Sequence, residues 1–110
     1  TTLPVSGAGT KVGIIDSGID PNHQEFAGKI VASKNFFDYT AQALDSVGHG
    51  THVAGTVTTA LRTNIASMAP GAQLLIAKVF GNTAVDDDAG FWDAYDCCGA
   101  QGADAVNTSF

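Results

Sequence analysis

The chain has 110 residues, 45% of them hydrophobic and 15% charged, which is the composition of one packed globular domain rather than of a disordered chain. Five Lys and Arg against 11 Asp and Glu give a formal net charge of -6, which repels phosphate backbones, so we expect no nucleic-acid partner. The longest apolar runs fall well short of the roughly 18 to 20 residues that span a bilayer, so we expect no membrane partner either.

The first predicted element is a strand over residues 11–16 (KVGIID), which a Ser-Gly pair ends. A short apolar run of this kind is typical of a strand buried on both faces of a parallel sheet. Residues 30–37 (IVASKNFF) have the same character and predict a second strand of this type.

A helix is predicted next, from His49 to about Arg62. Apolar side chains recur in this segment at helical spacing, at Val53, Ala54, Val57, Ala60 and Leu61. His49 lies in the first turn of this helix, close to the positive end of the helix dipole.

The rest of the chain repeats the alternation, with a strand over residues 73–80, a second helix, and a strand over residues 104–110. Asp86 to Asp88 stand at the predicted start of the helix, where its dipole favours negative charge, and Gly102 stands where the helix would stop. The helix is indicated by one apolar face, made of Phe91, Ala94, Tyr95 and Cys98.

The two cysteines, Cys97 and Cys98, are adjacent in this second helix. This spacing is too short for an ordinary disulfide between them, and it differs from the CxxC spacing of zinc and redox sites. We interpret them as small residues on a partly buried helix rather than as a reactive thiol pair.

Strands that alternate with helices predict an α/β fold with a parallel sheet of about four strands and right-handed crossovers. In such sheets functional groups gather at the carboxyl ends of the strands. Asp16 ends the first strand and His49 begins a helix, so we expect these two side chains to face each other at that edge.

The two histidines of the helix, His49 and His52, raise the question of metal binding, core packing or proton chemistry. A zinc-binding HExxH helix has histidines four apart with a glutamate beside the first, whereas these are three apart with Gly50 and Thr51 between them. Zinc is therefore not expected. For His52 we favour a hydrogen-bonded core residue that faces a neighbouring strand, since a three-residue offset cannot turn both rings toward one small site.

His49 fits a core role less well, because the helix dipole disfavours a buried imidazole in the first turn unless a carboxylate compensates. Asp16 is the candidate carboxylate. Such a pair serves nucleophilic catalysis, in which the carboxylate fixes the imidazole tautomer and the other ring nitrogen takes a serine proton. No serine of the chain lies in a GxSxG-type turn, and Ser17 is expected only to form the turn after the strand.

The segments IIDSGID (residues 14–20) and GHGTHVAGTV (residues 48–57) resemble the subtilisin-like serine protease family, and the two blocks in this order and spacing are highly specific. The resemblance implies a partial subtilisin-like fold with a Ser-His-Asp triad, in which Asp16 is the catalytic aspartate and His49 the general base and acid. His52 would be a structural residue of the motif. The implied enzyme is a secreted, extracellular endopeptidase that acts on peptide or protein substrates.

The resemblance also implies substrate-binding residues. Val85, Asp86 and Asp87 would belong to an edge strand that pairs with the substrate. Ser109 and Phe110 would line the pocket for the side chain before the cleaved bond.

No cofactor is required for this chemistry, but the resemblance raises calcium as a structural ion. Glu25 stands where the family often has a calcium-binding carboxylate, and residues 61–67 roughly match its calcium loop. Because an oxygen cage needs about six to eight ligands, the alternative of a solvated surface carboxylate at Glu25 is favoured.

By this resemblance residues 1–110 are the N-terminal part of one catalytic domain, and the oxyanion asparagine and the serine nucleophile would follow Phe110. We expect a partner, the C-terminal remainder of the protease that carries the serine, and no peptidase activity from these residues alone. The alternative is a catalytically silent fragment that acts as a peptide- or protein-binding module.

Overall fold

Within the residues that the computed structural model describes (6–36, 42–59, 67–81 and 88–109), four parallel strands form one sheet. The strands are β1 (Lys11–Asp16), β2 (Ile30–Asn35), β3 (Gln73–Lys78) and β4 (Ala105–Asn107). Their order across the sheet is β2-β3-β1-β4. The predicted α/β fold with a parallel sheet is confirmed.

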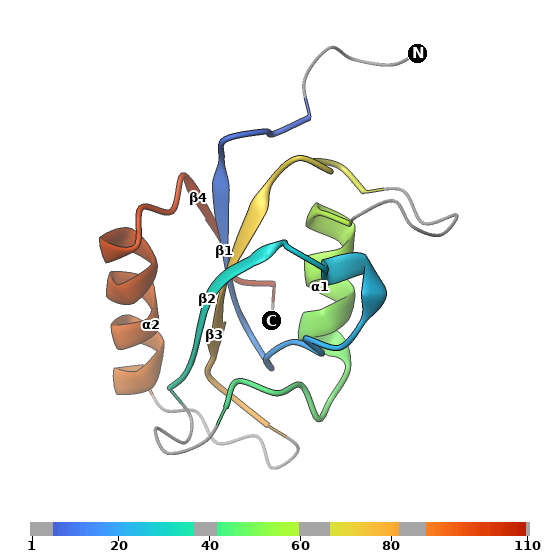
Figure 1. The fold of residues 1–110 in the computed structure, drawn as a ribbon. Coiled ribbons are helices and arrows are strands. Elements are labelled where there is room, and N and C mark those ends of the chain that lie inside the picture. Colours follow the sequence, from blue (N-terminus) through green and yellow to red (C-terminus); the bar gives the residue numbers. More distant parts are fainter. Residues whose placement is uncertain (1–5, 37–41, 60–66, 82–87, 110) are drawn as a thin grey trace.

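Each face of this sheet carries one helix in the described residues. Helix α1 (His49–Val57) lies on one side of the sheet and α2 (Asp88–Ala100) on the other (Figure 1). A single turn of 3-10 helix, η1 (Gln24–Phe26), packs Phe26 into the core on the α1 side. No helix within the described residues has the length and apolar character needed to cross a membrane.

The alternation of side chains along β1 divides the core into two clusters. Ile14 packs on the α1 side, in one cluster with Ala54, and Ile15 packs on the α2 side, in one cluster with Ala94. Because side-chain direction repeats at every second residue of a strand, Asp16 points to the same side as Ile14. The period of the strand therefore aims the Asp16 carboxylate at α1.

The bounds of β1 agree with the prediction, whereas the other strands are shorter than predicted. β2 ends at Asn35, β3 ends at Lys78, and the fourth strand is limited to Ala105–Asn107. The prediction that β2 is buried on both faces is wrong, because several of its side chains are exposed. It pairs only with β3 among the described residues and lies at the edge of the sheet.

Helix α1 ends at Val57 and not near residue 62 as predicted. Thr58 has extended backbone angles, φ -150° and ψ 140°, and its buried hydroxyl donates a hydrogen bond of 3.0 Å to the Ala72 carbonyl. Thr58 and Thr59 are also β-branched residues, which lose side-chain freedom in a helix. The bond to Ala72, distant in sequence, therefore overrides a helical pattern that is already weak at this point. Residues 60–62 of the predicted helix lie outside the described residues.

Helix α2 ends where the glycine signal predicts. Gly102 has φ +84°, its N–H donates to the Gly99 carbonyl at 3.1 Å, and the Ala103 N–H donates to the Cys98 carbonyl at 3.0 Å. These two bonds form a Schellman motif, which favours glycine at the left-handed position. The role of Gly102 as a helix stop is confirmed.

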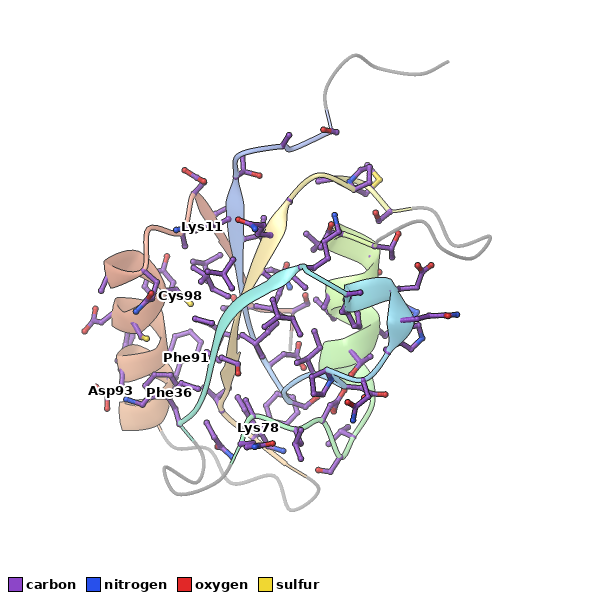
Figure 2. The ribbon with its side chains drawn as sticks, in the orientation of Figure 1. Lys11, Phe36, Lys78, Phe91, Asp93 and Cys98 are labelled. Atoms are coloured by element: carbon purple, nitrogen blue, oxygen red, sulfur yellow. The ribbon has the colours of Figure 1, made fainter. Side chains whose placement is uncertain are left out.

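The sheet-facing side of α2 is formed by two small residues and one aromatic residue. Ala94 and Cys98 are buried, and Phe91 packs beside them against Phe36, as Figure 2 shows for the labelled side chains. Tyr95 is 48% exposed, so its predicted place on the buried face is wrong. Both cysteines are free, one buried and one half-buried, which confirms their interpretation as small residues on a partly buried helix.

The packing of α2 on β1 leads to a first prediction. A Cβ on Gly13 would lie 2.9 Å from the Cys98 Sγ and 3.2 Å from the Val106 Cγ2. We expect Gly13→Ala to lower the free energy of unfolding by about 1–3 kcal/mol, because the added methyl overpacks this contact. Urea unfolding of the protein, followed by circular dichroism, measures the change.

Gly99 supplies the control, since a Cβ there would meet no atom within 4 Å. We expect Gly99→Ala to raise the free energy of unfolding by up to about 1 kcal/mol, because alanine favours the helix. If both substitutions changed stability in the same direction and by the same amount, the close approach of α2 to β1 would not be the reason for a glycine at position 13.

Candidate active site

The predicted pair of Asp16 and His49 is in contact. The His49 Nδ1 lies 2.8 Å from the Asp16 Oδ1. Asp16 ends β1 and is 0% exposed, whereas the His49 side chain, at the first position of α1, is 46% exposed. The burial assumed for the His49 ring from the sequence is therefore wrong. The imidazole is half open to solvent, whereas its carboxylate partner is fully enclosed.

The Asp16 carboxylate is held by two donors on one oxygen. Besides the His49 ring, the Ser17 N–H donates to Oδ1 at 2.7 Å, while Oδ2 is buried with no hydrogen-bond partner among the described residues. An ionised carboxylate only accepts, so a neutral His49 must carry its proton on Nδ1. The lone pair is then on Nε2, which is the tautomer that a general base needs.

Asp45, which was not among the predicted site residues, accepts five hydrogen bonds beside this pair. Its Oδ1 accepts from the Ser17 Oγ at 2.8 Å, the Val47 N–H at 3.0 Å and the Gly48 N–H at 2.8 Å. Its Oδ2 accepts from the Thr51 N–H at 2.8 Å and the Thr51 hydroxyl at 2.5 Å. One carboxylate therefore organises the segment that leads into α1.

A signal for Asp45 does exist in the sequence. The residue before α1 is Gly48, which has no side chain to cap the helix, so the free N–H groups of the first turn need another acceptor. An aspartate three residues upstream is within reach of them. Only the folded chain, however, brings Ser17 to the same carboxylate.

These hydrogen bonds control the ionisation of Asp45. Burial raises the pKa of the carboxyl, but the hydrogen bonds from Thr51, Gly48 and Ser17 outweigh it and lower the pKa from 3.8 to about 2. The carboxylate is therefore ionised throughout the range in which a histidine titrates.

Ser17 does more than form a turn. It is 0% exposed, and its hydroxyl accepts a hydrogen bond of 2.8 Å from the Gly50 N–H while it donates to Asp45. A Cβ on Gly50 would lie 2.3 Å from the Gly18 carbonyl oxygen. Glycine at position 50 thus allows α1 to approach the turn after β1 at backbone distance.

His52 is exposed, so its predicted place in the core is wrong. The buried positions of α1 are Gly50 and Ala54, and residue 52 projects from a different side of the helix. It lines a cavity of about 660 Å³ together with His23, Glu25 and Met68, among other residues. The structure therefore separates the two histidines, with one at the Asp16 contact and one at this cavity.

Glu25 is 1% exposed, so the favoured alternative of a solvated surface carboxylate is wrong. Its N–H donates to the His23 Nδ1 at 3.2 Å. Among the described residues no three His, Cys, Asp or Glu side chains gather as metal ligands would. The described residues that line the cavity beside Glu25 include two histidines and no second carboxylate. This set of side chains does not fit the oxygen cage that calcium needs. Residues 61–66 of the predicted calcium loop lie outside the described residues.

Most of the predicted substrate-binding residues, Val85, Asp86, Asp87 and Phe110, lie outside the described residues. Ser109 is described and exposed, and its Oγ accepts a hydrogen bond from the Asn107 side chain. The register pairs Ile14 with Asn107, so β4 brings Ser109 to the same carboxyl edge of the sheet as Asp16.

Comparisons of the chain with known proteins point to one family. A sequence profile described as "Subtilase family" matches residues 7–110. Thermitase of Thermoactinomyces vulgaris is 38% identical over 90 residues, which cover 80% of this chain and 31% of thermitase. The major intracellular serine protease of Bacillus subtilis (strain 168) is 43% identical over 83 residues, which cover 70% of this chain and 26% of that protein.

A similar fold occurs in the crystal structure of a cold adapted subtilisin-like serine proteinase. The TM-score is 0.83 at 29% sequence identity, and the match covers 99% of this chain and 39% of that one. The predicted subtilisin-like fold is confirmed. The chain spans about a third of the length of thermitase, at 31%, and less of the intracellular protease, at 26%.

The low pKa of Asp45 leads to a second prediction. Because its folded pKa of about 2 is below the unfolded value of 3.8, the stability it contributes is present above the unfolded pKa and is lost as the pH falls through the folded pKa. We expect Asp45→Asn to lower the free energy of unfolding at neutral pH and to reduce its pH dependence between about pH 4 and pH 2.

Urea unfolding of the protein between about pH 2 and pH 6 measures this effect. Asp96→Asn, which removes an exposed carboxylate of α2, is the matched control and should leave the curve nearly unchanged. If the free energies of unfolding of Asp45→Asn and of the unmodified protein differed by the same amount at every pH, the bonds to Asp45 would not depend on its charge.

Proposed function

Because the chain belongs to the subtilase family, we propose that it forms part of a serine endopeptidase that hydrolyses peptide bonds with a Ser-His-Asp triad. The observation that carries the proposal is the 2.8 Å contact between a buried carboxylate and a half-exposed imidazole. The relative from Bacillus subtilis is named a serine protease, and the chain corresponds to less than a third of that protein and of thermitase. The serine is therefore proposed to come from a part of the protein beyond residues 1–110.

The proposed reaction assigns a role to each of the two side chains. The serine oxygen attacks the peptide carbonyl carbon while the His49 Nε2 takes the hydroxyl proton. The imidazolium then gives that proton to the leaving amine, and water hydrolyses the acyl-enzyme in the same way. Asp16 stabilises the imidazolium through Nδ1. This chemistry needs no cofactor, and no step depends on calcium as a structural ion.

Substrate contacts and location are part of the proposal. We propose that Val85, Asp86 and Asp87 pair with an extended peptide, and that Ser109 and Phe110 line the pocket before the cleaved bond. The position of Ser109 at the carboxyl edge of the sheet supports this assignment.

A secreted enzyme is proposed by analogy with the family, although one relative is named as intracellular.

The partner of these residues is proposed to be the remainder of the same catalytic domain. β4 pairs with β1 alone among the described residues, through three residues, so its other edge is available for a further strand. The solved proteinase of similar fold is matched over 39% of its chain. Residues 1–110 alone are therefore proposed to lack peptidase activity.

Labelling with a fluorophosphonate, read by intact mass, tests the proposed function. We expect one label on the full-length protein and none on residues 1–110 alone, because only an activated serine reacts. A folded full-length protein that took up no label would contradict the protease proposal and favour a peptide-binding module.

Substitution of the two contact residues gives a third prediction. We expect His49→Ala and Asp16→Ala in the full-length enzyme each to lower kcat by about 10⁴-fold or more, the size of loss established for the triad of subtilisin itself. Peptide hydrolysis under saturating substrate measures the loss. His52→Ala is the control, because this exposed side chain is outside the contact. A loss at His52 as large as that at His49 would contradict the division of roles.

A further inference from the structure

Ser17 lies between two carboxylates at the carboxyl end of β1. Its N–H donates to the Asp16 Oδ1 at 2.7 Å, and its hydroxyl donates to the Asp45 Oδ1 at 2.8 Å. The same hydroxyl accepts the Gly50 N–H of α1 at 2.8 Å. One fully buried residue thus touches the strand end, the segment before α1 and the first turn of α1.

The direction of these bonds is fixed by chemistry. An ionised carboxylate only accepts, so the single hydroxyl proton of Ser17 must point to Asp45. An N–H only donates, so the Gly50 N–H must use a lone pair of the same oxygen. The hydroxyl has no proton left for His49, which excludes Ser17 as the nucleophile and leaves it a structural link.

The segment that carries Asp45 is itself held at two points. Its N–H donates to the Ile19 carbonyl at 3.1 Å, directly after the turn that follows β1. The buried ammonium of Lys78, the last residue of β3, donates to the Leu44 carbonyl. Asp45 therefore sits on a segment anchored to the sheet, and it holds the Thr51 N–H and hydroxyl of α1.

These bonds determine where α1 starts. The Gly50 and Thr51 N–H groups are free donors of the first helical turn, and they bond to Ser17 and Asp45. Because His49 is the residue before them, their attachment fixes its backbone relative to Asp16. The negative charge of Asp45 also offsets the positive end of the helix dipole, which otherwise disfavours an imidazolium in the first turn.

We propose that Ser17 and Asp45, which we call the Ser17–Asp45 pair, are positioning residues that set the contact between His49 and Asp16. The inference rests on the proposed function, since positioning matters for turnover only if the His49–Asp16 contact moves a proton. Among the described residues, hydrogen bonds place two charged groups beside His49: Asp16 contacts its ring, and Asp45 binds the N–H groups of nearby Gly48 and Thr51. Lys78 of β3 is level with Asp16 in the sheet.

The test uses the full-length protein and three variants. Ser17→Ala removes the hydroxyl and keeps the N–H to Asp16, and Ser17→Thr restores a hydroxyl. Thr58→Val is the matched control, because Thr58 has a buried hydroxyl with one backbone acceptor at the other end of α1. Peptide hydrolysis is measured across the acid side of the pH profile, together with urea unfolding.

We expect Ser17→Ala to lower kcat about 10-fold or more with KM changed less than about twofold, because the loss is one of geometry at the reacting groups. The acid limb of kcat should move to lower pH, since a weaker Asp16 contact stabilises the imidazolium less. Ser17→Thr should recover most of the lost kcat and most of the shift of the acid limb. Thr58→Val should lose stability but keep the acid limb in place.

Asp45→Asn separates charge from position. It removes a negative charge near His49, so the acid limb should move to lower pH. Because salt screens this charge, the shift should become smaller as salt is added. Ser17→Ala changes no charge, so its shift should be insensitive to salt. If Ser17→Ala lost only stability, as Thr58→Val does, and kept both kcat and the acid limb, the positioning role would be wrong.

A second readout keeps this inference separate from the proposed function. The proton between the His49 Nδ1 and the Asp16 carboxylate can be followed by NMR without any turnover, and it is assigned by its loss in His49→Ala. If the full-length protein neither turned over peptides nor took up a fluorophosphonate, the proposed function would fail. A changed resonance in Ser17→Ala would then still support positioning, and an unchanged one would contradict it.

Discussion

A carboxylate with no exposed surface is the constraint on which the rest of the site depends. Burial of an ionised aspartate costs free energy unless hydrogen bonds and an opposite charge compensate. Asp16 receives the Ser17 N–H from the turn directly after β1 and the His49 ring from the first residue of α1. The compensation of one buried charge therefore joins the end of a strand to the start of a helix 33 residues later.

Two glycines make this junction possible. A Cβ on Gly50 would lie 2.3 Å from the Gly18 carbonyl oxygen, and a Cβ on Gly18, where φ is +107°, would lie 2.6 Å from the Ala43 carbonyl oxygen. The turn after β1, the segment before α1 and the helix itself meet at backbone distance. Any larger side chain at either position would separate the segments, and the hydrogen bonds of Asp45 would no longer reach Ser17 and Thr51 together.

The elements that local signals define were predictable from the sequence, and those that distant contacts define were not. The apolar run of β1 gave its bounds, and Gly102 gave the end of α2 through a bond pattern within the helix. The contact of Asp16 with His49 followed from the alternation of strands and helices. The end of α1 was missed because the Thr58 hydroxyl bonds to Ala72. The uncapped start of α1 signals a nearby acceptor such as Asp45, but its bond to Ser17 could not be predicted because only the fold brings the two residues together.

The order of strands in the sheet also governs how the chain assembles. β1 is the first strand that the structure describes, but its neighbours in the sheet are β3 and β4, and in the described part of the chain β2 pairs with β3 alone. Neither early strand can therefore form its backbone ladder with β3 before that later segment is in place, and until then their apolar side chains lack the neighbours that bury them. Parallel sheets of such non-local pairing fold slowly and expose surface to aggregation. The native topology is therefore complete only when β3 lies between both early strands.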